Sequence, residues 1–212
     1  MYDLLLDRRT NLLGGLCEDE LKEFLRQCSA GLFYIHKQDL AHLDIKPANI
    51  FRSFCETVAV EPNFEDDCNN RTSVCYKIGD LGHVSPTTAK SWNDGDCRYM
   101  SRELIEPRGQ ARDIRKADIF ALGLSAYEAA SLVDLPQNGP YWHSIRSDGV
   151  QIVEKLSEEL SDLISTMIQE NSATRPTANE ISESEILSDY MSNQKLQNLL
   201  KAEMEKNKRL QR

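Results

Sequence analysis

The chain has 212 residues, of which 40% are hydrophobic and 28% are charged, and its mean hydropathy is -0.51. These values are typical of a globular protein, and they exclude collagen-like, low-complexity and wholly disordered chains. Acidic residues outnumber basic residues by 34 to 25, which gives a net charge of -9. That balance argues against a protein built to bind nucleic acid through its phosphates.

Cysteine usage and hydropathy further narrow the class of protein to which the chain can belong. The six cysteines form no C-x-x-C pair and only four histidines are present, so a zinc site is not expected. No stretch approaches the roughly 20 apolar residues that span a bilayer. The first residues, MYDLLLDRRT, lack the basic start of a secretory signal. We therefore expect no membrane partner, and free thiols in a reducing compartment.

Hydrophobic periodicity predicts a mainly helical chain. Apolar side chains recur at three- and four-residue steps in residues 18–38, and acidic residues fill the first turn, where the helix dipole favours them. Residues 117–133 are apolar nearly all round, which predicts a buried central helix. Shorter helices are expected at residues 141–149, 157–169 and 178–188.

Between the first helix and the buried helix the pattern changes. Two short strands, Ile50–Ser53 and Val74–Gly79, predict a short β hairpin. Residues 53–74 are interpreted as an acidic insert between them, and residues 189–212 as a charged helical tail. The expected fold class is therefore α+β and predominantly α-helical.

The most informative segment is HLDIKPAN, residues 42–49. It resembles the H-R-D-L-x-x-x-N catalytic loop of protein kinases, with Leu43 in place of the arginine. Thirty-one residues beyond Asn49, Asp80-Leu81-Gly82 follows the second strand and resembles the D-F-G motif. Because these two motifs come in the family's order, the match is more specific than either motif alone.

Three further features follow in the order in which protein kinases carry them. Ser101-Arg102-Glu103 stands where A-P-E is expected, Asp118 opens the buried helix, and Arg175 precedes a proline near the end. The set resembles the C-terminal lobe of a eukaryotic protein kinase, and the resemblance covers residues 1–188. It implies a kinase-like fold for that part of the chain.

The resemblance implies a site for ATP and Mg²⁺. Phosphoryl transfer depends on positioning and charge neutralisation more than on covalent chemistry. Asp44 is expected to accept or orient the proton of the acceptor hydroxyl, and Lys46 to neutralise charge on the transferred phosphate. Asn49 and Asp80 are the expected Mg²⁺ ligands, since this cation prefers oxygen donors.

The resemblance also assigns structural roles. His42 is expected to be buried against the D-L-G turn. Glu103 and Arg175 are expected to form a buried ion pair that tethers the activation segment, the stretch from Asp80 to Glu103. Loss of one partner of such a pair costs ~3–5 kcal/mol.

Leu43 carries a prediction about regulation. An arginine beside the catalytic aspartate is a cation that an activation-segment phosphate can meet, and leucine removes it. We therefore interpret four hydroxyls of the segment as ordinary loop residues rather than switches: Ser85, Thr87, Thr88 and Ser91.

Several phrases narrow the resemblance to the Wee kinase family, the inhibitors of mitotic entry. They are YIHKQDLAHLDIKPANIF, YKIGDLGHV, GDCRYMSREL, KADIFALGLS and LPQNGPYWHSIRSDG. The related membrane-bound Myt branch shares HLDIKPANIF, but it usually keeps phenylalanine after the D-F-G aspartate, so Wee is favoured. Ser101-Arg102 departs from the family's pattern, which leaves the substrate platform less defined.

The Wee resemblance implies a substrate and a location. The substrate would be a tyrosine in the nucleotide-binding loop of a cyclin-dependent kinase, and the location would be the nucleus first and the cytoplasm second. Tyrosine specificity follows only from the family, because Lys46 is typical of serine/threonine kinases.

The motifs of the N-terminal lobe of a kinase are not found in these residues. Neither a G-x-G-x-x-G loop nor a V-A-I-K strand occurs, so we expect a C-terminal lobe without its N-terminal lobe, monomeric and inactive alone. The alternative is a non-catalytic module that binds a cyclin-dependent kinase through residues 90–150. The intact Asp44, Asn49 and Asp80 argue against a decayed kinase.

Overall fold

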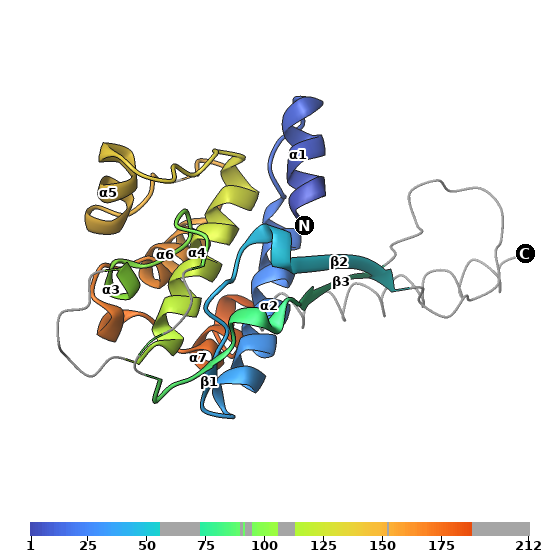
Figure 1. The fold of residues 1–212 in the computed structure, drawn as a ribbon. Coiled ribbons are helices and arrows are strands. Elements are labelled where there is room, and N and C mark those ends of the chain that lie inside the picture. Colours follow the sequence, from blue (N-terminus) through green and yellow to red (C-terminus); the bar gives the residue numbers. More distant parts are fainter. Residues whose placement is uncertain (56–72, 90, 92–94, 106–112, 152, 188–212) are drawn as a thin grey trace, which may run out of the picture.

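The computed structural model describes residues 1–55, 73–89, 91, 95–105, 113–151 and 153–187 (Figure 1). Its α-helices are α1 (Tyr2–Thr10), α2 (Glu18–His36), α3 (Arg102–Ile105), α4 (Arg115–Ser131), α5 (Pro140–Ser147), α6 (Glu158–Met167) and α7 (Ala178–Ser182). Its strands are β1 (Leu40–Ala41), β2 (Ile50–Cys55), β3 (Ser73–Ile78) and β4 (Ser85–Pro86), and its 3-10 turns are η1 (Pro47–Asn49), η2 (Leu81–His83) and η3 (Ser172–Thr174). The helix-rich fold class is confirmed. No helix in these ranges is long and apolar enough to cross a membrane.

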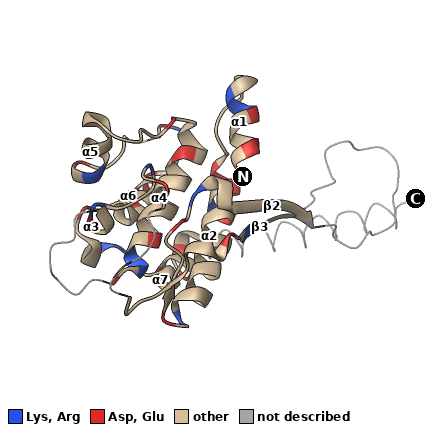
Figure 2. Cartoon of the chain, in the orientation of Figure 1, with Lys and Arg blue, Asp and Glu red and all other residues tan. Residues whose placement is uncertain are grey.

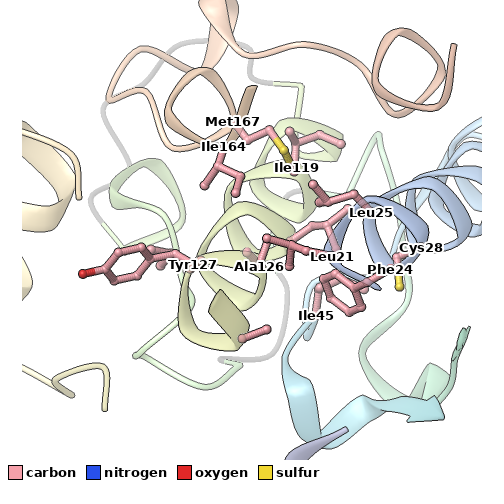
Figure 3. Close-up of a cluster of buried hydrophobic side chains, with 14 of the residues drawn as sticks. Leu21, Phe24, Leu25, Cys28, Ile45, Ile119, Ala126, Tyr127, Ile164 and Met167 are labelled. Carbon is pink, nitrogen blue, oxygen red and sulfur yellow. The ribbon is translucent and has the colours of Figure 1, made fainter. Parts of the chain in front are cut away.

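The core lies where α2 packs across α4, with α6 on the other side of α4 (Figure 3). The apolar stripe of α2 is fully buried at Leu21, Phe24 and Leu25. Burying each such side chain contributes about 1.5–3 kcal/mol. Every residue of α4 from Ala117 to Ala130 is buried, as the sequence predicted.

A glycine allows α6 to approach α4 closely. A Cβ on Gly123 would lie 2.8 Å from Ile168 and 2.9 Å from Met167, so a larger residue would push the helices apart. Lys and Arg are interspersed with Asp and Glu along the described ribbon (Figure 2).

The turn between α1 and α2 docks on the C-terminal end of α4. The Leu16 amide donates to the Ala129 carbonyl at 2.8 Å. A Cβ on Gly15 would lie 1.9 Å from the Ala130 carbonyl oxygen, so only glycine fits this close backbone approach. Arg9 of α1 completes the contact through an ion pair of 2.7 Å with the buried Glu128.

The predicted hairpin is confirmed as antiparallel pairing of β2 with β3, with Ile50 opposite Ile78. It projects from the helices toward the right of Figure 1. Tyr76 anchors it by an edge contact with Phe24, at 5.3 Å between ring centroids, and by a hydroxyl bond to Glu20. Burial and the neighbouring Glu20 carboxylate raise the pKa of Tyr76.

β2 is longer than the sequence indicated, whereas β3 has the predicted length and is shifted by one residue toward the N-terminus. β2 extends to Cys55 and β3 begins at Ser73, which takes three residues at one end and two at the other from the range assigned to the acidic insert. Residues 56–72, the rest of that insert, lie outside the described residues.

A second small sheet was not predicted. Leu40 pairs with Pro86 and Ala41 with Ser85, and the Thr87 amide donates to the Asp39 carbonyl at 2.8 Å. Strands of two residues are too short to show alternation in a sequence. This pairing ties the end of α2 to the segment after the D-L-G turn.

The predicted helices at 18–38, 117–133, 141–149 and 157–169 are confirmed to within two residues at each end. The prediction of one continuous helix over 178–188 is wrong, because α7 ends at Ser182 and helical structure resumes only at residues 185–187. Ile181 and Leu187 are both fully buried, and on a continuous helix they would lie about 120° apart. The break lets both face the core. The tail, 189–212, lies outside the described residues.

Candidate active site

The candidate catalytic loop lies between β1 and β2. It contains the 3-10 turn η1, which begins at Pro47, where the fixed φ of proline suits a helical first position. Leu43 has a φ of 64°, a left-handed conformation that costs energy in a residue with a large side chain. A loop held in this conformation requires anchoring by its surroundings.

Asp118 supplies that anchor. Its carboxylate accepts the amide hydrogens of His42 and Leu43, both at 2.7 Å, and faces the His36 Nε2 at 2.8 Å. It is 1% exposed and lies in the first turn of α4, where the helix dipole favours a negative charge. The sequence analysis placed Asp118 only as the start of a helix. The structure shows that it is the fourth residue and fixes the catalytic loop.

Three of the four predicted site residues meet at the Asp44 carboxylate. Lys46 Nζ lies 2.8 and 3.0 Å from its two oxygens. Asn49 Nδ2 donates to Oδ2 at 2.7 Å and to the Asp44 carbonyl at 2.8 Å. Asp44 is 5% exposed, so these charge-assisted hydrogen bonds hold its carboxylate in one orientation.

A fourth contact comes from the activation segment. The Asp96 amide donates to Asp44 Oδ1 at 3.3 Å. Its neighbour Gly95 passes so close that a Cβ there would lie 2.7 Å from the Leu43 carbonyl oxygen. The sequence did not predict this contact, because the close approach that requires glycine at position 95 is to Leu43 and Asp44, which are distant in the chain.

Asp96 is itself fixed by Arg98. Two side-chain hydrogen bonds, at 2.9 and 2.6 Å, join the guanidinium to the carboxylate. Burial alone would raise the pKa of Asp96, but the hydrogen bonds and the charge of Arg98 outweigh it and lower that pKa. The carboxylate therefore stays ionised beside the site.

The structure places Asp80 nearby but not in contact with the other three. Asp80 is exposed, has a left-handed φ of 60°, and accepts a hydrogen bond from the Gly82 amide at 3.3 Å. The residue before it, Gly79, donates its amide to the Asn49 carbonyl at 2.9 Å and faces the His42 Nε2 through its own carbonyl at 3.1 Å. The buried position of His42 against this turn is confirmed.

The two residues predicted to hold Mg²⁺ fit that ion chemically. The Asn49 nitrogen is used by Asp44, which leaves its amide oxygen for a cation, and Asp80 offers an exposed carboxylate. Both are the hard oxygen donors that Mg²⁺ takes.

The predicted ion pair between Glu103 and Arg175 is confirmed. Two parallel hydrogen bonds, at 2.5 and 3.1 Å, join the groups, and the Arg175 side chain is 1% exposed. Arg175 also donates to the carbonyls of Gln169, Glu170 and Lys116. The pair therefore tethers α3, at the end of the activation segment, to the turn before α7.

These features define a class of protein. An anchored loop presents Asp44 with Lys46 and Asn49, a D-L-G turn lies beside it, and a buried ion pair holds the segment that follows. The protein kinase domain model matches residues 5–187, and the chain belongs to the protein kinase family.

Comparison with curated proteins places the chain in the Wee branch of that family. It is 38% identical over 208 residues to a Wee1-like protein kinase of Drosophila melanogaster, covering 91% of this chain and 34% of that protein. It is 42% identical to Wee1-like protein kinase 2 of Ailuropoda melanoleuca and 40% identical to that of Homo sapiens, each covering 80% of this chain and 31% of the relative. The chain thus spans about a third of the length of these relatives.

Proposed function

We propose that this chain is the catalytic-loop portion of a Wee-type kinase that transfers the γ-phosphate of ATP to a tyrosine of a cyclin-dependent kinase and so delays mitosis. The observation that carries the proposal is the Asp44 carboxylate, held by Lys46 and Asn49 on a loop anchored to Asp118. The substrate, and a nuclear location, rest on the family resemblance alone.

The residues of the site have different roles in phosphoryl transfer. The buried Asp44 orients the acceptor hydroxyl and receives its proton. Lys46, 22% exposed and already beside Asp44, lies where it would neutralise negative charge on the group in transfer. Magnesium, when bound with ATP, would be held by Asn49 and Asp80 and would neutralise the phosphate charge.

Transfer also requires residues that cover the ATP phosphates, and no G-x-G-x-x-G loop is found in these 212 residues. Beside the site, Leu81 is 62% exposed and Phe51 is 59% exposed. The Phe51 ring lies against Gly79, two residues before Leu81, and exposed apolar side chains at such a place favour cover by another part of a complete kinase. We propose that the activity belongs to a protein in which an N-terminal lobe covers this surface.

The alternative is a lone lobe that binds a cyclin-dependent kinase without modifying it. The mass of the endogenous protein decides between the two, measured intact after capture with an antibody against residues 189–212. A mass well above 24.1 kDa supports the complete kinase, whereas a mass of 24.1 kDa favours the binding module.

Asp80→Asn tests the proposed metal ligand in the complete kinase. We expect the affinity for ATP to fall at least about tenfold in magnesium, because a charged oxygen donor becomes a neutral one. The measurement is calorimetric titration of ATP over a range of Mg²⁺ concentrations. Asp39→Asn is the matched control, since Asp39 is also exposed and left-handed. An unchanged magnesium dependence in Asp80→Asn would exclude this ligand.

Replacement of Ser85, Thr87, Thr88 and Ser91 by alanine tests the prediction from Leu43. The rate of transfer is expected to stay within about twofold of wild type, because Leu43 stands where an arginine would meet an activation-segment phosphate. The rate is measured with a peptide substrate on protein expressed in the same cells as the wild type. A large fall in rate, restored by acidic residues at these positions, would show that one of them is a switch.

A further inference from the structure

Arg146 of α5 is buried, and within the described part of the chain its hydrogen-bond partners are all backbone carbonyls. Its side chain lies among the largest fully buried ones of the described residues. Nε and Nη2 donate to the Met100 carbonyl at 2.9 and 2.6 Å, and Nη2 also lies 3.1 Å from the carbonyls of Cys97 and Arg98. Nη1 donates to the Trp142 carbonyl at 3.0 Å. One guanidinium thus holds three carbonyls of the activation segment.

Trp142 reinforces the same contact. The Arg146 guanidinium lies 3.5 Å from the centroid of the Trp142 ring, and the Phe120 ring of α4 lies 5.5 Å from it. The indole Nε1 of Trp142 donates to the Cys97 carbonyl at 2.8 Å. Stacking on an aromatic face and a planar set of donors are properties of arginine that lysine does not share.

The buried group keeps its charge at neutral pH. Burial lowers the pKa of Arg146 to about 9, which still leaves the guanidinium protonated at pH 7. Its hydrogen-bond acceptors among the described residues are all carbonyl oxygens. A buried cation without a bonded carboxylate is costly, so its carbonyl bonds must be kept for the segment to be stable.

The clamped stretch, residues 97–100, connects the Asp44 site to helix α3. It follows Asp96, whose amide contacts Asp44, and precedes Ser101 and the tethered Glu103. Within it, the Tyr99 hydroxyl donates to the buried Glu128 at 2.5 Å. The stretch is therefore fixed from α5 and α4, by groups already present in the chain.

We propose that Arg146 is a positioning residue that holds residues 97–100 in the conformation that receives the substrate peptide, in the place of an activation-segment phosphate. The proposal deepens the proposed function and rests on it. Leu43 removes the cation that a phosphate would meet, and Arg146 supplies an internal cation that meets carbonyls of the same segment instead.

The first test uses the 212-residue chain and needs no activity. Hydrogen exchange is measured in wild type, Arg146→Met, Arg146→Lys and the control Ser147→Ala, an exposed neighbour on α5. In Arg146→Met we expect exchange at residues 99–104 to be at least about tenfold faster, with α2 and α4 unchanged. Arg146→Lys should be intermediate, since it keeps the charge but loses the planar donors.

Two results would overturn the proposal. Exchange that accelerates equally in α2, α4 and residues 99–104 would make Arg146 a general stability residue. An unchanged exchange rate at residues 99–104 would show that Arg146 does not stabilise the conformation of that segment. If Arg146→Met does not fold, Arg146→Lys is judged by the same two criteria.

The second test uses the complete kinase. Arg146→Lys is expected to raise the KM for a peptide substrate about tenfold while the KM for ATP is unchanged, because only the peptide-binding segment is displaced. A fall in kcat with both KM values unchanged would instead mean loss of folded enzyme and would contradict the proposal. If the wild type transfers no phosphate, the proposed function fails, and the exchange experiment alone decides the role of Arg146.

Discussion

Replacing Asp44 with asparagine in the complete kinase is expected to reduce phosphoryl transfer by about 10²–10⁴-fold, the range that a positioned general base contributes. Asparagine has the same shape as aspartate, and the hydrogen bonds that Asn49 and the Asp96 amide donate to Asp44 can be rearranged around it. The asparagine side chain, however, cannot take up the proton of the acceptor hydroxyl. ATP affinity should stay within about twofold, since Asp44 is not among the proposed metal ligands. Single-turnover transfer and ATP titration measure the two quantities separately.

The control is Asp39→Asn, a change of the same chemistry three residues before His42, the first residue of the catalytic loop. The Asp39 side chain is 86% exposed and its closest cation, Arg115, is 3.8 Å away. Transfer should be unaffected in this variant. Loss of ATP binding in Asp44→Asn would contradict the assigned role, and so would transfer at the wild-type rate.

The largest loss of stability is expected from Glu103→Ala. The change leaves Arg175, whose side chain is 1% exposed, without its carboxylate, and breaking a buried pair in this way costs about 3–5 kcal/mol. The free energy of unfolding of the 212-residue chain, measured in urea, should fall by that amount. Because Glu103 lies in α3, the activation segment should also lose its tether to the turn before α7.

Two further variants separate the ion pair from general effects. Asp134→Ala breaks a pair with Arg9 in which the aspartate is 84% exposed, and it should change the free energy of unfolding by less than about 1 kcal/mol. Adding Arg175→Met to Glu103→Ala should cost less than the sum of the two single changes, because no unpaired buried charge remains. Additive losses would show that the two groups do not act as a pair.

Local patterns predicted most of the elements and the members of the site. The stripe of α2 and the apolar α4 were visible because burial repeats at helical spacing. Asp44, Lys46 and Asn49 were predicted to act together because they lie within six residues of one another, and the structure confirms that they meet. Their roles in transfer stay predictions that the variants above test.

The missed features depend on partners distant in sequence. The β1 and β4 strands have two residues each and exist only because they pair across about 45 residues. The break after α7 accompanies the burial of both Ile181 and Leu187, a tertiary arrangement that helix propensity does not encode. The anchoring of the loop by Asp118 involves residues separated by 75 and 76 positions.

By itself, the sequence determined the helix-rich class, the order of the kinase motifs and the types of residue at the site, because each is written in local spacing and composition. Only the tertiary structure decided how the site is held. Asp118 fixes the strained Leu43, the Asp96 amide reaches Asp44, and Arg146 binds carbonyls 46 to 49 residues before it in the chain. Those contacts form between backbone groups and buried charges, and backbone groups carry no signature in a sequence until folding brings them within hydrogen-bond distance.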